Sequence, residues 1–320
     1  MKGNDIMATS GKVIHFTLAA YLLVAAAGSN LFAAGQIDSN IVNTISHPFL
    51  CSDNTQGKVF EMSATGKILW EYAAVSCQDV WKLTNGNYLL SHVHGVKEVK
   101  PDKTIVWEYK SPDGTEVHNC QPLPDGNVMI CEGGSKRLME INIKGEVVKE
   151  LKVEAATRNA HMQFRAVRKL NNGHYLIALV GENMLREIDE TGKSVWEFKT
   201  PGNVYIGVRL PNGNTLAGCG DGHTLIEIDK NDKIVWQVTE NELPGIPLRF
   251  VAGIQRLPNG NTVICNWGGH GHIGKQPQVI EVTPDKKVVW QIADYNTFRA
   301  IAGIQLLDVP GDPAKGVLLK

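Results

Sequence analysis

The sequence predicts an all-β fold, a six-bladed β-propeller, and two recurring features carry this prediction. An Asn-Gly or Asp-Gly dipeptide lies between apolar runs at intervals of 40, 47, 40 and 47 residues, at Asn85, Asp125, Asn172, Asn212 and Asn259. A tryptophan recurs in a second register, at Trp70, Trp107, Trp196, Trp236 and Trp290, with Lys149 in the third copy. Repeats of about 40 to 50 residues that hold four short strands are typical of propellers, whose blades bury their faces by stacking.

Each of these dipeptides predicts a hairpin turn between two strands. We expect a type I′ turn, in which both central residues have positive φ, because asparagine followed by glycine is the residue pair that this turn favours. A β-sandwich is the alternative fold for a chain of many short strands. It gives no reason for one tryptophan and one turn to stay in register through six copies, so the propeller is favoured.

The strands follow one another in a regular order. Residues 48–73 hold three strands, PFLCSD, KVFEMS and KILWEY, with no dipeptide turn before them. Five units of four strands then begin near Asp79, His118, Arg165, Tyr205 and Ala252. The segment AIAGIQLLD (300–308) copies FVAGIQRLP (250–258) and supplies one last strand. We expect three N-terminal strands and this C-terminal strand to form the closing blade, which leaves no open array edge. Residues 316–319 resemble a further strand, so a partial seventh blade stays open.

The N-terminus differs from the rest of the chain. Lys2 and Lys12 precede an apolar run, 13–27, that ends in small residues. This layout predicts a secretory signal peptide, residues 1–29, with cleavage after Ala27, Ser29 or as late as Ala34. An uncleaved amphipathic leader is the alternative. We expect a periplasmic or secreted protein, without membrane insertion after removal of the signal, that forms a single propeller domain over 40–320.

Composition excludes some partners. The 320 residues carry a net charge of −1, which gives no basic surface for nucleic acid. A hydrophobic content of 43% is enough for a packed core.

The histidines gather in the segments that we expect at the mouth of the central channel. His92, His94, His118, His161, His223, His270 and His272 all fall there. The first strand of each unit contains a recurring leucine. The residues five positions before this leucine, one from each unit, are Gln78, His118, Arg165, Tyr205, Ala252 and Ala302. Residues on loops of a rigid scaffold often bind ligands. We therefore predict that Gln78, Asn119, Arg165 and Tyr205 contribute to a ligand site at the mouth.

Two further arginines are candidates for the same site. Arg249 and Arg299 lie three residues before Ala252 and Ala302. A guanidinium offers a planar fork of donors to carboxylate, phosphate or sulfate, so arginines at the mouth favour an anionic ligand. The alternative is that they pair with nearby acids such as Glu240 or Asp294. Trp267 lies outside the repeated tryptophan register and is predicted to form an apolar wall of the site.

A metal site is a separate hypothesis. His92 and His94, and likewise His270 and His272, have i, i+2 spacing, which on a strand places both rings on one face. Solvated histidines are the alternative for both pairs. The cysteines are interpreted as packing residues, and Cys77 with Cys120 is the pair that an exported protein would most readily bridge.

The repeat ATGKILW (64–70), echoed in ETGKSVW (190–196) and NDKIVW (231–236), resembles the quinoprotein-type repeat of pyrroloquinoline-quinone (PQQ) dehydrogenases and their cofactor-free relatives. The resemblance implies a propeller fold. PQQ itself is not expected, because the chain has no adjacent cysteine pair and about six blades instead of eight.

The motif LPNGNT (210–215 and 257–262) resembles repeats of the bacterial arylsulfotransferases, which are exported six-bladed propellers. The resemblance implies sulfate transfer through a histidine at the channel mouth. His118 and His161 match as the catalytic residues, with Asn119, Arg165 and Arg249 nearby. Arginines would hold the sulfonyl oxygens while a neutral imidazole attacks sulfur.

The leading expectation is an exported binding or interaction module. Its histidine- and arginine-lined mouth would take a small polar or anionic ligand or a protein partner, and no cofactor is expected. The alternative is a histidine-dependent enzyme similar to arylsulfotransferases. A metal-assisted enzyme acting on carbohydrates or lactones is the third hypothesis.

Overall fold

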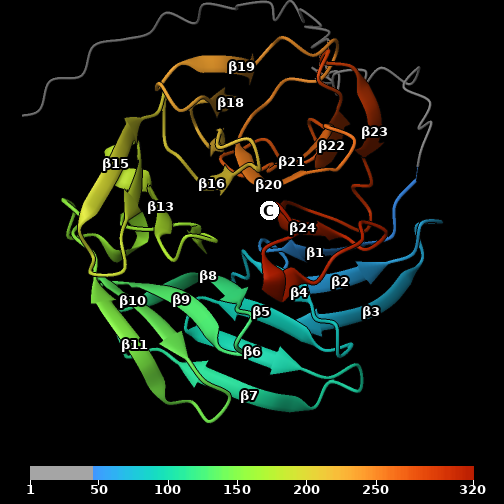
Figure 1. Ribbon diagram of the computed structural model, residues 1–320. Helices are drawn as coiled ribbons and strands as arrows, with labels where there is room; N and C mark the ends of the chain where they lie inside the picture. Colours follow the sequence, from blue (N-terminus) through green and yellow to red (C-terminus); the bar gives the residue numbers. More distant parts are fainter. Residues whose placement is uncertain (1–45) are drawn as a thin grey trace, which may run out of the picture. The chain divides into compact units, whose positions relative to one another are not determined.

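The computed structural model describes residues 46–320 and shows six four-stranded antiparallel sheets. They form a ring around a common axis, with the first strand of each sheet toward the centre (Figure 1). The predicted signal peptide, 1–29, lies outside the described residues. Within the described part of the chain, no helix is long and apolar enough to cross a membrane.

The blades follow the chain in order. The first contains β24 (Ile301–Leu306), β1 (Phe49–Asp53), β2 (Lys58–Met62) and β3 (Ile68–Ala73). The second contains β4 (Val80–Lys82), β5 (Tyr88–His92), β6 (Gly95–Val99) and β7 (Ile105–Lys110). The third contains β8 (Glu116–Pro122), β9 (Val128–Gly133), β10 (Arg137–Ile141) and β11 (Val147–Lys152).

The fourth blade contains β12 (Val167–Lys169), β13 (Tyr175–Leu179), β14 (Met184–Ile188) and β15 (Ser194–Lys199). The fifth contains β16 (Ile206–Arg209), β17 (Thr215–Cys219), β18 (Thr224–Ile228) and β19 (Ile234–Val238). The sixth contains β20 (Val251–Arg256), β21 (Thr262–Asn266), β22 (Val279–Val282) and β23 (Val288–Ile292). Three short 3₁₀ helices complete the described residues, η1 (Ala160–Met162), η2 (Val180–Glu182) and η3 (Pro313–Lys315).

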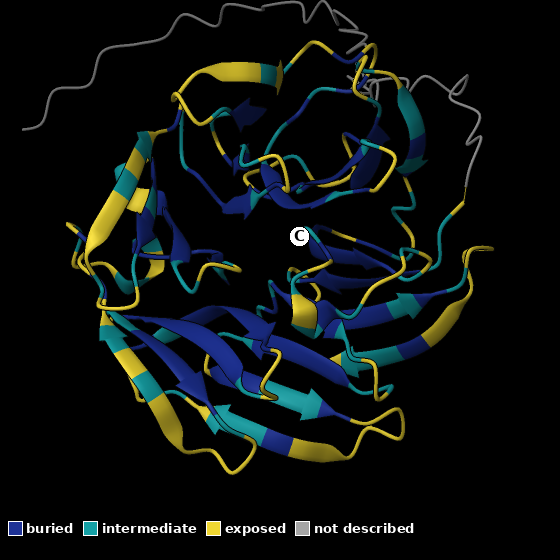
Figure 2. Ribbon diagram, in the orientation of Figure 1, coloured by how far each residue is buried: buried dark blue, intermediate teal, exposed yellow. Residues whose placement is uncertain are grey.

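The predicted closure of the ring is confirmed. β24, from the end of the chain, pairs antiparallel with β1 and makes the innermost strand of the first blade. The segment 316–319 forms no seventh sheet in the described residues. It crosses the end of the channel instead, where Leu319 makes an isolated bridge with Arg256 of β20. The inner strands are buried and the outer strands are partly exposed, so the core lies between neighbouring blades (Figure 2).

The predicted hairpin turns are present, but their type differs from the prediction. In the turn at Asn85, the carbonyl of Leu83 accepts a hydrogen bond from the Gly86 amide, and φ is positive at Gly86 alone, at 85°. A type I′ turn needs positive φ at both central residues, so the hairpin is a three-residue loop with glycine in the left-handed position. Asn85 stabilises the turn through its side chain instead, because its Oδ1 accepts a hydrogen bond from the Asn87 amide at 2.9 Å.

The tryptophan register is a repeated element of blade-to-blade packing. Each tryptophan on an outer strand lies opposite a glutamate, such as Trp70 opposite Glu61, and Lys149 takes this place opposite Glu140. The Trp70 indole donates to the Pro101 carbonyl of the next blade at 3.0 Å, and Trp236 donates to Pro284 in the same way at 2.8 Å. The tryptophans therefore connect blades, as predicted.

The glutamates opposite the tryptophans bind basic side chains of the following blade. The ion pairs are Lys82–Glu61, Lys169–Glu140, Arg209–Glu187 and Arg256–Glu227, and His47 binds Glu281 across the closure. Glu98 is the exception. The third blade has Pro122 where four others have lysine or arginine, and Glu98 accepts hydrogen bonds from Asn85 and Asn87 of its own blade. These acids therefore link neighbouring blades at five of the six junctions.

Candidate functional site

A cavity of about 510 Å³ opens at the mouth of the channel, away from the dipeptide turns. We call it the mouth cavity. The structure brings many of the predicted site residues into its lining, namely Gln78, His118, His161, Arg165, Tyr205, Trp267 and His270. Glu116, Asp221 and Phe250 join them. Residues from all six blades therefore meet over one opening, because each blade directs the start of its innermost strand toward the axis.

The base of the mouth cavity is formed by β8 and η1. Glu116 and His118 are two residues apart on β8, and His161 lies in η1, which Asn159 caps by accepting from the His161 amide. The pairing of β8 with β9 shifts register between Val117 and Cys120, so His118 and Asn119 form a β-bulge. Bulges turn side chains out of the regular alternation, and they recur beside functional sites.

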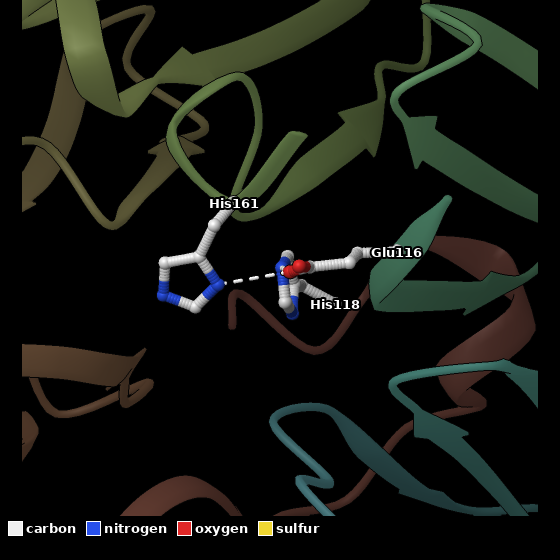
Figure 3. Close-up of side chains that lie close together, drawn as sticks. All are labelled: Glu116, His118 and His161. Atoms are coloured by element: carbon white, nitrogen blue, oxygen red, sulfur yellow. Dashed lines mark hydrogen bonds and ion pairs between the residues drawn. The ribbon is translucent and has the colours of Figure 1, made fainter. Parts of the chain in front are cut away.

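Glu116, His118 and His161 converge on one point (Figure 3). His161 Nδ1 lies 2.8 Å from Glu116 Oε2 in a hydrogen bond, and His118 Nε2 lies 2.9 Å from the same oxygen. The His118 ring is not aligned for a hydrogen bond, and within residues 46–320 both of its nitrogens lack such a partner. His118 is only 5% exposed, so both nitrogens are buried; Nε2 has only the Glu116 contact, and Nδ1 has no partner among the described residues.

Glu116 and His118 differ in their state of ionisation at neutral pH. Burial lowers the pKa of His118 to about 4, against the opposing effect of Glu116. Contacts with His118 and with His161 lower the pKa of Glu116 to about 2. At pH 7 Glu116 is therefore ionised and His118 is neutral. A neutral, buried imidazole beside a carboxylate can act as a metal ligand, a base or a nucleophile.

Arg165 lies beside this cluster and is 8% exposed. Its guanidinium donates to the carbonyls of His161 and Phe164, and its Nη2 lies 2.7 Å from His161 Nε2. Among the described residues no carboxylate forms an ion pair with it. Burial lowers its pKa, because a desolvated cation is disfavoured. A buried guanidinium without a counterion, at the base of a cavity, attracts an anion.

An aromatic wall faces this polar base. The Trp267 ring packs edge-on against Phe250 at 5.0 Å and against His270 at 5.1 Å between ring centroids. Its indole donates to Asn54 Oδ1 at 2.8 Å, which fixes the ring. Tyr205 continues the wall through an edge-on contact with Phe250 and donates its hydroxyl to Gln78.

Some predicted residues lie elsewhere. Asn119 is 1% exposed and lines a smaller cavity of about 20 Å³ below the mouth cavity, where its side-chain amide has no hydrogen-bond partner among the described residues. Arg249 and Arg299 are not among the residues that line the mouth cavity. Arg249 forms an ion pair with Glu240, which is the alternative that the sequence left open, and Arg299 is exposed.

The two i, i+2 histidine pairs do not lie on strands. β5 ends at His92, and His94 is exposed in the turn that follows. His270 lies in a turn with φ of 55° and pairs with Asp221, while His272 follows in the same loop. Neither pair belongs to a group that can hold a metal in the described residues. The prediction failed because the i, i+2 rule needs an extended backbone, and both pairs fall where the chain reverses.

The channel is closed below by three charged side chains, Asp79, Arg168 and Lys320, which we call the channel floor. Asp79 lies 2.9 Å from Arg168 and 3.0 Å from Lys320, and all three are buried. A cavity of about 550 Å³ lies on the turn side of the floor. Its main basic side chains, Arg168, Lys169 and Arg209, are already paired with carboxylates, so it offers less to an anion than the mouth does.

The cysteines form no disulfide in the structure. All six are buried, and the sulfurs of Cys77 and Cys120, the predicted pair, both face the Asp79 carbonyl. Sequence reasoning also missed Glu116. The available signal was its place two residues before His118, a spacing that in an extended segment puts both side chains on one face.

The comparisons with known proteins agree with the fold. A protein of unknown function from Bacteroides caccae has a crystal structure with 32% identity and a TM-score of 0.75, over 81% of this chain and 98% of that one. A streptogramin B lyase shares the fold at 12% identity and a TM-score of 0.55, over 80% of this chain and 85% of that one. An inactive virginiamycin B lyase from Staphylococcus aureus, solved with quinupristin, shares the fold at 13% identity and a TM-score of 0.55, over 82% of this chain and 88% of that one.

No curated protein matches the sequence. The family described as Mal s 1 allergenic protein-like matches over residues 58–287, from the first blade into the sixth. The resemblances to quinoprotein repeats and to arylsulfotransferases stay expectations. The match covers most of the propeller, and the chain therefore belongs to the Mal s 1 allergenic protein-like family.

Proposed function

We propose that this propeller is an exported binding module that holds a small anionic ligand in the mouth cavity. The observation that carries the proposal is Arg165, a buried guanidinium with no carboxylate partner among the described residues. Leaving a buried charge unpaired is costly, and an anionic ligand would offset that cost with charge-assisted hydrogen bonds. Gln78 and Tyr205 lie beside the same opening and add polar contacts.

The shape of the cavity supports a small ligand over a protein partner. Its volume of about 510 Å³ falls in the range of about 300–1,000 Å³ that is usual for small-molecule sites. The wall of Trp267 and Phe250 suits an aromatic or aliphatic body attached to the anionic group. A protein partner would instead need a broad surface around the rim.

The proposal predicts that anions stabilise the protein through Arg165. We expect inorganic sulfate, inorganic phosphate or 4-nitrophenyl sulfate to raise the melting temperature of the wild type. At a free ligand concentration of 100 times Kd, binding stabilises the folded state by about 2.7 kcal/mol. Arg165→Gln should abolish this shift, because glutamine keeps donors but loses the charge. Differential scanning fluorimetry over an anion titration measures it.

The control is Arg299→Ala, which removes an exposed arginine outside the cavity. Sulfate and phosphate stabilise proteins by exclusion from their surface, so only the part of the shift that depends on Arg165 counts. The proposal fails if no anion stabilises the wild type beyond what Arg165→Gln shows. A shift that is lost in Arg299→Ala and kept in Arg165→Gln would also contradict it.

The second candidate is histidine-dependent sulfate transfer, which the neutral state and unpartnered nitrogens of His118 favour. The Nδ1 lone pair would form an N–S bond to an aryl sulfate while the S–O bond to the aryl group breaks. The phenolate leaves as the anion, and Glu116 stabilises the imidazolium. An acceptor phenol then displaces the imidazole from sulfur and passes its proton to solvent.

This candidate predicts sulfate transfer from 4-nitrophenyl sulfate to a phenol, followed by the absorbance of released nitrophenolate. His118→Ala should reduce the rate to background, while His270→Ala, at the opposite wall, should keep most of it. An inactive wild type over a panel of donors and acceptors would remove the candidate and leave the binding proposal standing.

A further inference from the structure

We propose that Glu116, His118 and His161 form a binding site for a divalent transition-metal ion of the Zn²⁺ type at the base of the mouth cavity. This site goes beyond the proposed anion binding and does not depend on it. It also differs from the histidine pairs that the sequence suggested, since it joins two blades and includes a carboxylate (Figure 3).

The distances fit a metal site whose ligands lie closer together without an ion than they would around one. The three donor atoms lie within 4.8 Å of one another, and two of the edges, from Glu116 Oε2 to the histidines, are 2.8 and 2.9 Å. Ligands at about 2.0–2.1 Å from a tetrahedral zinc ion are separated by roughly 3.3 Å. The two edges to Glu116 therefore have to open by about 0.4–0.5 Å, which is a side-chain adjustment.

Two of the three ligands are held by the scaffold and one can move, which suits this adjustment. Glu116 and His118 come from β8, a strand of the propeller ring, and His118 is buried at the bulge. His161 comes from the short helix η1, and its side chain is about half exposed. Two ligands are thus held by the scaffold and the third can move toward the ion.

His118 is the independent observation that points to a missing ligand. Both ring nitrogens are buried. Nδ1 makes no hydrogen bond within the described residues, and Nε2 has only the Glu116 contact at 2.9 Å, which is not aligned as a hydrogen bond. Buried polar atoms are nearly always satisfied, so this ring calls for a better partner. A metal ion at Nε2 would supply one, because a neutral imidazole is a ligand for zinc.

The donor set favours a transition metal over calcium or magnesium. Those hard cations are bound by six or more oxygen ligands, or keep several waters, whereas this site offers two nitrogens and one carboxylate. Two histidines and one glutamate, with an open fourth position, form a ligand set used by catalytic zinc. Two histidines and a carboxylate also bind ferrous iron. Zn²⁺ is the probe because it needs no redox partner.

Metal binding would also change the contact between Arg165 and His161. In the structure His161 donates its Nδ1 proton to Glu116, and its Nε2 accepts from the Arg165 Nη2 group. A metal at Nδ1 takes the place of that proton, and a neutral ring then carries its proton on Nε2. Two donors would face each other, so the Nη2 group has to move away from the His161 ring, while Nη1 can keep its bond to the His161 carbonyl. Nη2 is then free to bind a ligand in the cavity.

The test is titration of Zn²⁺ into the metal-free, untagged full-length chain by isothermal calorimetry. We expect one equivalent bound by the wild type. Glu116→Gln and His161→Ala should each weaken binding by about 100-fold or more, since a direct ligand is worth at least as much as an outer-shell partner. Glutamine preserves the shape of Glu116, and His161 is exposed, so both variants should fold. Circular dichroism checks that they do.

Two controls separate this proposal from the others. His270→Ala removes another exposed mouth histidine and should bind Zn²⁺ like the wild type. Arg165→Gln, which abolishes anion binding in the first proposal, should bind Zn²⁺ at least as tightly because a nearby positive charge is gone. A wild type that binds no Zn²⁺, or binding that survives in both Glu116→Gln and His161→Ala, overturns the metal site. A tight wild-type site also counts against His118 as a sulfate carrier, because the metal holds it.

Discussion

Replacing Asp79 with alanine is expected to lower the free energy of unfolding by about 3–5 kcal/mol, the cost of removing one partner from a buried ion pair. Asp79 is 5% exposed and is the carboxylate that neutralises Arg168 and Lys320 in the channel floor. Without it, two buried cations face each other next to Trp81, whose ring lies 3.7 Å from Lys320 Nζ. Urea denaturation at pH 7 measures the change.

The control for this prediction is Asp285→Ala, which breaks an exposed ion pair with Lys287 and should leave stability unchanged within error. A second variant tests the physical reason. Adding Lys320→Met to Asp79→Ala removes one of the unpaired cations and should restore part of the stability. An Asp79→Ala protein as stable as the wild type, or a double variant weaker than the single, would contradict the assignment. Burial lowers the pKa of Lys320, which agrees with a charge that depends on its partner.

Replacing Trp290 with alanine should cost about 3–5 kcal/mol, as expected for a fully packed tryptophan. Trp290 is 4% exposed and packs edge-on against His47 at 5.0 Å and Phe49 at 5.9 Å, across the junction between the sixth and first blades. A cavity at this place loosens the contact that closes the ring. Chemical denaturation, with limited proteolysis near residue 47, reports both the stability and the place where the ring opens.

Trp196→Ala is the matched comparison, since it removes a tryptophan from the same register in the fourth blade. That ring is only partly buried, and its indole donates to Asp232 at 2.7 Å. We expect a loss of about half that of Trp290→Ala, because the transfer energy scales with buried area. Equal losses of unfolding free energy at the two positions would show that the closing junction contributes no more to stability than another junction between blades.

The candidate site combines two charge environments that the fold keeps apart. The mouth holds Arg165 without a carboxylate partner among the described residues, whereas the channel floor pairs its cations with Asp79. The proposed anion would therefore bind at the mouth and not at the floor. The cluster of Glu116 with two histidines lies beside Arg165, so a ligand and a metal ion can share one opening.

Sequence patterns predicted the repeat because it is local. The dipeptide turns, the tryptophan register and the copy of residues 250–258 at 300–308 all depend on short segments. The structure confirms six sheets and the closing strand. The same patterns contained the inter-blade ion pairs, since a basic residue precedes the recurring leucine in four blades. That signal becomes meaningful only when the glutamate of the preceding blade is known to lie opposite.

The errors arose where local rules met irregular backbone. His92 and His94 were placed on one strand, but the strand ends between them. The dipeptide turns were assigned to type I′, but the asparagines keep negative φ and only the glycines have positive φ. Arg249 had the right place in the repeat, yet Glu240 lies close enough to bind it. Turns and side-chain partners depend on neighbours that a single segment does not specify.

The sequence by itself determined that this chain is a closed ring of six blades, and that histidines and an arginine gather at one end of it. Repeats encode this information, since each blade has to bury its faces against the next. Only the tertiary structure decided which of those side chains meet. Glu116 and His161 are 45 residues apart and meet only in the folded chain, where the bulge at His118 and the capped turn that carries His161 set how the side chains are directed. Coulombic and ligand interactions act over a few ångströms, so the chemistry follows from those distances.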